Sequence, residues 1–349
     1  MRYLRIPLYL LVLALAGFIF LLLFGTLSDY KPEKKTSVFE NPDAPPLTDS
    51  IFRLMTWNIG YCGLGEEMDF FYDGGRGVRP DRATSEANLE GVLDYVKTLD
   101  SCDFFLFQEV DIQSKRSYRI NQLKRLENGL YPVLVAFGKN FDVAFNPAPP
   151  RDPIGKVVSG IATLSRKIPV SSVRYSFPGN YPWPKGVFML DRCFLVNRYP
   201  LKGGRELLLI NTHNSAYDDG SLRKAQMETL RGFLLSEYRK GNYVVVGGDW
   251  NQTPYGFRPE FERDVFDTIQ LSFIPEDYLP GDWTWLFDPS VPSNRRVDKP
   301  YLAGSSLTTV IDFFLLSPNV KALYVMGVDL GFIHSDHNPV LAGFKLKQP

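Results

Sequence analysis

The chain has 349 residues, of which 44% are hydrophobic and 14% aromatic, and this composition excludes an intrinsically disordered protein. Lysine plus arginine and aspartate plus glutamate number 39 each, so no net charge draws the whole protein to polyanions. The balance argues against a non-specific DNA-binding protein, which usually carries a basic surface, although a local basic patch stays open.

The three cysteines, Cys62, Cys102 and Cys193, lie far apart and show no C-x-x-C spacing. This spacing argues against a zinc knuckle and against a dense disulfide framework. We predict buried free thiols, because free cysteine is among the most buried residue types. A single bridge stays open for a domain outside the cytosol.

Residues 6–24 form an uncharged apolar segment near the N-terminus. A helix of about 19 residues at 1.5 Å each extends roughly 28 Å, close to the hydrocarbon thickness of a bilayer. Arg2 and Arg5 precede the segment and favour a cytosolic N-terminus, although three lysines follow it. We predict a membrane anchor at residues 1–25, in a single-pass protein whose remainder lies on the non-cytosolic side. A cleaved signal peptide and a secreted protein are the alternative.

Residues 26–50 are polar and rich in proline and serine, which predicts a tether. One folded domain is predicted over residues 51–346. Apolar residues recur at i, i+3, i+4 and i+7 over residues 82–99 and 221–239, which predicts two helices. Short apolar runs predict strands over residues 52–58, 104–107, 130–137, 160–165, 187–196, 206–212, 243–246, 310–316, 323–328 and 339–344. Many strands with few helices indicate packed sheets flanked by helices, in an α/β or α+β arrangement.

Polar and ionisable residues gather where the predicted strands end, a place where rigid scaffolds often present catalytic groups. They are Asn58, Glu109, His213, Asp249 and Asn251, with Asp336 and His337 just before the last strand. Each of these alone is weak evidence, because Gly, Asp and Asn also favour turns and Glu is usually solvated. Asp312 lies inside an apolar run, where a buried carboxylate needs a partner.

The chemistry of this set fits phosphoester hydrolysis. Carboxylate and amide oxygens suit Mg²⁺ or Mn²⁺. A carboxylate such as Asp249 can take a proton from an attacking water, and an imidazolium can stabilise negative charge on a phosphate. Asp312 could orient His337 in that role.

An ordered set of segments resembles the endonuclease/exonuclease/phosphatase superfamily, and the resemblance spans residues 51–346. That superfamily includes DNase I-like nucleases, apurinic-site endonucleases, bacterial sphingomyelinases, inositol polyphosphate 5-phosphatases and deadenylases. The segments are MTWNIG (55–60), FQEVD (107–111), GIATLSR (160–166), NTH (211–213), GGDWNQTP (247–254), TW (284–285), IDFFLLS (311–317) and SDHNPV (335–340).

The resemblance implies a DNase I-like fold, a four-layer α/β/β/α sandwich with its site at one end of the paired sheets. It also implies that Asn58 and Glu109 hold Mg²⁺ or Mn²⁺, with Asp336 as a further metal or proton-relay residue. His213 would contact the scissile phosphate. The remaining implied roles are Asp249 as base, Asn251 orienting water or phosphate, and Asp312 supporting His337.

The substrate stays open, because the superfamily shares a reaction and not a substrate. The membrane anchor, the neutral charge and an aromatic segment at residues 177–188 favour a phospholipid or sphingolipid head group, as in the sphingomyelinases. A nuclease acting on nucleic acid is the alternative. An inositol phosphate phosphatase and an inactive membrane-bound binding module are weaker hypotheses, and no obligate protein partner is implied. The insert at residues 61–83 is either a mobile surface loop or a phosphate-gripping lid carrying Arg76, Arg79 and Arg82.

Overall fold

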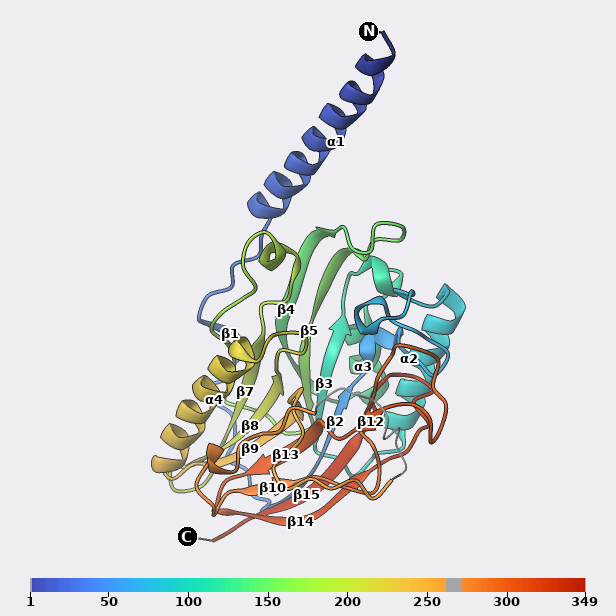
Figure 1. Ribbon diagram of the computed structural model, residues 1–349. Coiled ribbons are helices and arrows are strands. Elements are labelled where there is room, and N and C mark those ends of the chain that lie inside the picture. The colour runs from blue at the N-terminus through green and yellow to red at the C-terminus, as the bar shows by residue number, and fades with distance from the viewer. Residues whose placement is uncertain (1, 262–270, 349) are drawn as a thin grey trace.

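Two β-sheets lie face to face at the centre of the computed structural model, which describes residues 2–261 and 271–348 (Figure 1). One sheet has seven strands in the order β1 (Lys35–Glu40), β6 (Ser171–Ser176), β7 (Cys193–Pro200), β8 (Glu206–His213), β9 (Tyr243–Asp249), β13 (Asp312–Leu316) and β10 (Thr284–Leu286). The other has six, in the order β14 (Val320–Gly327), β15 (Val340–Leu346), β2 (Ile51–Asn58), β3 (Phe104–Asp111), β5 (Gly155–Ser165) and β4 (Leu134–Asn146). A separate ribbon pairs β11 (Asn294–Arg295) with β12 (Thr308–Thr309).

Helices cover the outer faces of both sheets. They are α2 (Arg82–Lys97), α3 (Gln122–Leu130) and α4 (Ser221–Arg239), whereas α1 (Arg2–Leu27) projects away from the sheets. Five 3₁₀ turns complete the described elements: η1 (Gly60–Cys62), η2 (Phe71–Asp73), η3 (Lys115–Ser117), η4 (Lys185–Phe188) and η5 (Glu276–Tyr278).

The alternation of side chains along the strands produces the four layers. Phe52 and Leu54 of β2 pack between the sheets, in one cluster with residues of β7, β8, β9 and β13. Met55 and Trp57 of the same strand face the other way, into a cluster with α2 and α3. On the far side, α4 packs on the outer face of the seven-stranded sheet. The central strands therefore bury both faces, which explains why they read as continuous apolar runs, and the predicted four-layer sandwich is confirmed.

The three predicted helices are present, the apolar N-terminal one as α1 and the other two as α2 and α4, and nearly every predicted strand has a counterpart. The run at residues 130–137 is different, because α3 occupies its first residue and β4 begins only at Leu134. The predicted strand at residues 187–196 begins late for a similar reason, since η4 precedes β7. All three cysteines are free and buried, as predicted.

The predicted tether at residues 26–50 contains a strand. Lys35–Glu40 forms β1, which pairs antiparallel with β6 at the edge of the seven-stranded sheet. An open sheet edge presents unpaired N–H and C=O groups, so a passing extended segment gains hydrogen bonds there even without an apolar pattern. The ordered part of the domain therefore begins before residue 51.

The helix α1 projects from one end of the sandwich, and the C-terminus lies at the opposite end (Figure 1). Its segment Ile6–Leu27 is long and apolar enough to cross a membrane, and nearly all of it is exposed. A signal sequence has the same length and character, so the helix is compatible with either role.

Candidate active site

The strands bring five of the eight predicted site residues to one end of the sandwich. Because β2 and β3 are parallel, as are β8 and β9, their carboxyl ends meet at the same edge. In the register, His213 lies opposite Asp249, and Asp249 lies opposite Asp312 on the next strand. Three residues far apart in the sequence are therefore direct neighbours across the sheet.

Two site residues have left-handed backbone conformations that aim their side chains. Glu109 has a φ of 54° and lies at the irregularity where β3 pairs with β5. Asn251 has a φ of 51° and lies two residues after the end of β9. Such conformations are uncommon for residues other than glycine and often mark functional sites. In β3 the irregularity lets Gln108 turn inward to Asn211, at 2.7 Å, while Glu109 faces the pocket.

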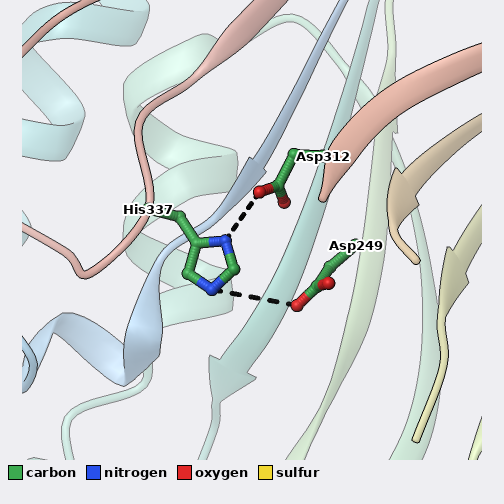
Figure 2. Close-up of side chains that lie close together, drawn as sticks. All are labelled: Asp249, Asp312 and His337. Carbon is green, nitrogen blue, oxygen red and sulfur yellow. Dashed lines mark hydrogen bonds and ion pairs between the residues drawn. The ribbon is translucent and has the colours of Figure 1, made fainter. Parts of the chain in front are cut away.

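Asp312 and His337 form a hydrogen-bonded dyad (Figure 2). Nδ1 of His337 lies 2.7 Å from Oδ2 of Asp312, and the hydroxyl of Ser293 donates to the same oxygen at 2.8 Å. The indole N–H of Trp57 donates to the backbone carbonyl of His337 at 2.8 Å. Burial opposes protonation of His337, but the negative charge of Asp312, reinforced by Asp336, outweighs it and raises the pKa to about 10. His337 is therefore a cation at neutral pH.

Asp249 lies between the two histidines. Its Oδ2 is 3.5 Å from Nε2 of His213 and 3.8 Å from Nε2 of His337. The amide of Asn58 donates to Oδ2 at 3.0 Å, and the backbone N–H of Asn251 donates to Oδ1 at 2.9 Å. Burial and the nearby Asp312 charge raise the pKa of Asp249 to about 6, so it is mainly ionised at neutral pH and can accept a proton.

His213 has the opposite protonation state to His337. Burial, together with the positive charges of Arg192 and His337, places its pKa well below the ordinary value. Its Nε2 also lies 3.9 Å from Oε1 of Glu109. Environments that push two similar groups apart in pKa are typical of sites with divided acid and base roles.

The three predicted metal ligands offer oxygen donors at the same place. The amide of Asn58 donates to Glu109 at 3.5 Å, and its own Oδ1 accepts from the backbone N–H of Gly60 at 3.0 Å. Burial and the charge of Glu109 raise the pKa of Asp336 to about 7, although the cationic His337 opposes the shift. Two neighbouring carboxylates that repel each other, with the amide oxygen of Asn58 beside them, fit a hard divalent cation such as Mg²⁺.

A second group could also be considered for a metal. One ligand atom each of Asp249, Asp312 and His337 lies within 4.8 Å of the others. However, Nδ1 of His337 is already hydrogen-bonded to Asp312, and that carboxylate oxygen also accepts from Ser293. Nδ1 of His337 and Oδ2 of Asp312 are therefore already engaged within the protein.

A pocket of about 440 Å³ opens over these residues. Its lining includes all the predicted site residues except Asp312, which lies behind His337. One side of the pocket is apolar, and a set of tyrosines, Tyr72, Tyr181 and Tyr217, also lines it. Tyr72 and Tyr217 stack with their ring centroids 5.6 Å apart.

Arg192 is a pocket residue that the sequence did not point to. Its Nη1 is buried and has no hydrogen-bond partner among the described residues. Burial lowers the pKa of this guanidinium, whereas the charges of Glu109 and Asp249 oppose that change, so all three groups share one electrostatic environment. The stretch around Arg192 carries no motif, and only the fold brings it to the catalytic residues.

The insert at residues 61–83 is packed against the domain. Tyr61, Leu64, Met68 and Phe70 form a buried cluster with Val297. The guanidinium of Arg295 donates to backbone carbonyls of the insert, including that of Gly65 at 2.6 Å. Two of its arginines are engaged elsewhere, because Arg79 pairs with Asp152 and Arg82 with Glu86. The insert therefore contributes a wall of the pocket, through aromatic and apolar side chains.

Comparison with known proteins gives a family match over most of the chain. Residues 55–337 match the model of the Endonuclease/Exonuclease/phosphatase family. A search of curated proteins found no match.

Several solved structures have a similar fold. An endonuclease/exonuclease/phosphatase from Beutenbergia cavernae DSM 12333 is 17% identical, with a TM-score of 0.55, over 85% of this chain and 72% of that one. ANGEL2, a 2′,3′-cyclic phosphatase in complex with adenosine-2′,3′-vanadate, is 15% identical with a TM-score of 0.56, over 91% and 100%. TDP2 of D. rerio, complexed with a single strand DNA product, is 14% identical with a TM-score of 0.53, over 85% and 100%. At these identities the likeness establishes the shared fold.

Proposed function

Because the chain belongs to the endonuclease/exonuclease/phosphatase family of phosphoester hydrolases, we propose that it is a metal-dependent phosphodiesterase that releases lipid head groups. The observation that carries the chemistry is the placement of Asp249 between a neutral and a cationic histidine at the floor of a pocket. The substrate would be a phospholipid or a sphingolipid, and the membrane helix would hold the enzyme where such lipids are.

In the proposed reaction, Asp249 accepts a proton from the water that attacks phosphorus. Asn251 holds Oδ1 of Asp249 through its backbone N–H, and we propose that its side chain orients the water or the phosphate. The cation His337, held by Asp312, stabilises negative charge on the phosphoryl oxygens, and His213 contacts the scissile phosphate. Asn58, Glu109 and Asp336 would hold Mg²⁺, with Mn²⁺ as a substitute. A bound cation supplies Lewis acidity toward a phosphoryl oxygen.

Arg192 completes the site as a phosphate-binding residue. A guanidinium presents N–H groups in a fork that matches two phosphate oxygens. Nη1 of Arg192 has no hydrogen-bond partner among the described residues, so its N–H groups can donate to a phosphate. The charges of Glu109 and Asp249 act on the same guanidinium. A buried donor without a partner is costly, so a substrate phosphate would gain binding energy there.

The apolar side of the pocket favours a lipid over a small phosphate ester. Phe141, Ile154, Met189 and Leu190 line the pocket, and Phe141, Ile154 and Leu190 belong to one apolar cluster. Such a combination of apolar and charged lining suits a substrate with a charged head and an apolar body. Together with α1 and the balanced charge of the chain, this combination is the support for a lipid substrate.

A nuclease is the second candidate, because the tyrosines of the pocket offer faces on which bases could stack. An inositol phosphate phosphatase is a weaker alternative. An inactive binding module is weaker still, since the complete catalytic set has no use in such a protein. For localisation, we propose a single-pass membrane protein with its catalytic domain on the non-cytosolic side. Removal of α1 as a signal sequence would instead give a secreted enzyme.

A substrate panel tests this proposal. The full chain in mild detergent, with and without Mg²⁺, would be given choline- and ethanolamine-phosphosphingolipids, phosphoinositides, plasmid DNA and RNA. Release of a lipid head group that requires both Mg²⁺ and Asp249, with Asp249→Ala as the inactive control, would support the lipid phosphodiesterase. Cleavage of nucleic acid alone would replace it with the nuclease. A folded protein silent on every substrate would favour the binding module.

A further inference from the structure

The last turn of α1 is docked against the loop at residues 177–188, which we call the interfacial loop. The indole N–H of Trp183 donates to Oγ1 of Thr26 at 3.1 Å. Gly25 is buried there, and a Cβ at its position would lie 2.9 Å from Cε1 of Phe188 and 3.2 Å from Cγ2 of Val187. The helix backbone therefore packs directly on the loop at the last turn of α1.

The contact places Trp183 at the level where a bilayer would end. The apolar segment Ile6–Leu27 has 22 residues, or about 33 Å of helix, which is close to the hydrocarbon thickness of a membrane. Thr26 lies in its last turn, so the indole bonded to it lies at the membrane–water boundary, where tryptophan is favoured.

Trp183 is also the tryptophan that the fold leaves in solvent. Its exposed fraction is 63%, whereas Trp57, Trp250 and Trp283 are 1%, 0% and 6% exposed. Trp285 is half-buried in the cluster beneath α4. A large aromatic side chain that is exposed beside a membrane helix indicates a contact with the bilayer.

The interfacial loop continues directly into the wall of the catalytic pocket. Tyr181, two residues before Trp183, lines the pocket, so at most about 7 Å of chain separates the two positions. After the loop, Leu190 lines the pocket too and packs, with Phe188, on the cluster of Phe141 and Ile154. The segment that contacts α1 therefore packs, through Phe188 and Leu190, against apolar residues that line the pocket.

The arrangement of the sheets agrees with this geometry. Figure 1 shows the carboxyl end of β3 pointing toward the end of the sandwich from which α1 projects. The turn between β4 and β5, next to Phe141 and Ile154, lies at that end as well. The catalytic residues and the anchor therefore share one end of the molecule, and the C-terminus lies at the other.

From these contacts we propose that the interfacial loop is a membrane-docking surface, which holds the pocket at the bilayer that α1 spans. The inference rests on the proposed function, and it adds that the enzyme acts in cis on lipids of its own membrane. Trp183 enters the boundary region of the bilayer, and the exposed Lys185, whose Nζ lies 3.7 Å from the Tyr181 ring centroid, meets the lipid phosphates.

Fluorescence quenching tests the docking without any need for activity. The full chain would be reconstituted in phosphatidylcholine vesicles that contain lipids brominated either near the head group or near the end of the acyl chain. We expect the shallow bromines to quench the wild-type tryptophan emission and to quench Trp183→Phe much less, because the other tryptophans lie inside the domain. Equal quenching of the two proteins would overturn the proposal.

An activity ratio tests the consequence for catalysis. Each protein would be assayed on vesicle lipid and on the water-soluble diester bis(p-nitrophenyl) phosphate. Trp183→Ala should lower hydrolysis of vesicle lipid about tenfold, the effect of losing one buried large side chain, and leave the soluble diester unchanged. Leu323→Ala, an exposed apolar side chain on β14, is the matched control and should change neither rate.

The outcomes separate this inference from the proposed function. Equal loss on both substrates in Trp183→Ala would assign Trp183 a role in folding or chemistry and overturn the docking surface. Unchanged hydrolysis of vesicle lipid would overturn it while the lipid phosphodiesterase stands. If the wild type cleaves only nucleic acid, the proposed function fails, and the quenching experiment still decides whether the loop meets the bilayer.

Discussion

At the scale of single residues, the site is built on two histidines whose environments differ. His337 is a cation because Asp312 bonds to one of its ring nitrogens, whereas His213 is neutral because it is buried beside Arg192 and His337. The Oδ2 atom of Asp249 lies 3.5 Å from Nε2 of His213 and 3.8 Å from Nε2 of His337, so a carboxylate lies between a neutral and a cationic imidazole. The different protonation states of the two histidines therefore follow from the neighbours of each ring.

The pKa shifts predict a bell-shaped pH profile. Asp249 must be ionised to act as a base, so kcat/KM should rise as pH increases through about 6. His337 must be protonated, so kcat/KM should fall as pH increases through about 10. Asp312→Asn removes the negative charge that raises both pKa values and should move both limbs to lower pH. Steady-state rates at one fixed metal concentration measure this, and limbs that stay in place in Asp312→Asn would contradict it.

Arg192 is predicted to bind the transition state. Arg192→Ala should lower kcat/KM by about a hundredfold, the effect of removing one preorganised donor. Arg192→Lys keeps the positive charge but loses the paired N–H groups of the guanidinium, so its kcat/KM should lie between those of the wild type and Arg192→Ala. Arg82→Ala, which removes an exposed arginine paired with Glu86, is the control and should leave kcat/KM nearly unchanged. Circular dichroism would verify the folding of each variant, and an active Arg192→Ala would exclude this role.

At the scale of elements, β1 is an edge strand formed by a segment without an apolar pattern. Its residues pair with β6, and Val38 packs on the buried cluster of Ala136, Ile161, Cys193 and Leu195. The strand therefore closes one edge of the seven-stranded sheet. It also shortens the connection between α1 and the sheets.

Removal of β1 should destabilise the domain. A chain that begins at residue 45 should be less stable than one that begins at residue 31 by about 2 kcal/mol, since several cross-strand pairs are lost. Urea denaturation followed by intrinsic fluorescence would measure the difference in the free energy of unfolding. Coincident unfolding curves for the two chains would show that β1 adds nothing to the stability of the sheet.

At the scale of the whole molecule, the site joins the two halves of the sandwich. Asn58 and Glu109 come from the six-stranded sheet, whereas Asp249 and Asp312 come from the seven-stranded one. A cation held by residues such as Glu109 and Asp336 would offset repulsion between buried carboxylates and so stabilise the folded state.

Mg²⁺ is therefore expected to raise the melting temperature. At a concentration about 100 times its Kd, a ligand that binds only the folded state adds about 2.7 kcal/mol, or a few degrees for a domain of this size. Glu109→Gln should lose most of this increase, while Asp142→Asn, away from the pocket lining, should keep it. Calorimetry in buffers with Mg²⁺ and with a chelator would measure the melting temperature of each protein. If Mg²⁺ raises the melting temperature of Glu109→Gln as much as that of the wild type, Glu109 is not a metal ligand.

The sequence by itself determined most of the strands, three of the four described helices and the family, and the resemblance to that family implied the four layers. It could do so because strands buried on both faces are continuous apolar runs, and because the polar residues that end them keep a characteristic order. The resemblance also pointed to the residues that the fold gathers, from Asn58 at the end of β2 to the Asp312–His337 dyad. Their individual roles stay predictions.

Only the tertiary structure decided the parts that depend on contacts between distant segments. The strand β1 exists because β6 offers an open edge, and Arg192 reaches the pocket because β7 starts there. The charge of each histidine depends on neighbours that the sequence does not place beside it. The contact between Thr26 and Trp183 joins residues 157 positions apart. A local pattern reports which face of an element is buried, but it carries no information about which other element will lie against that face.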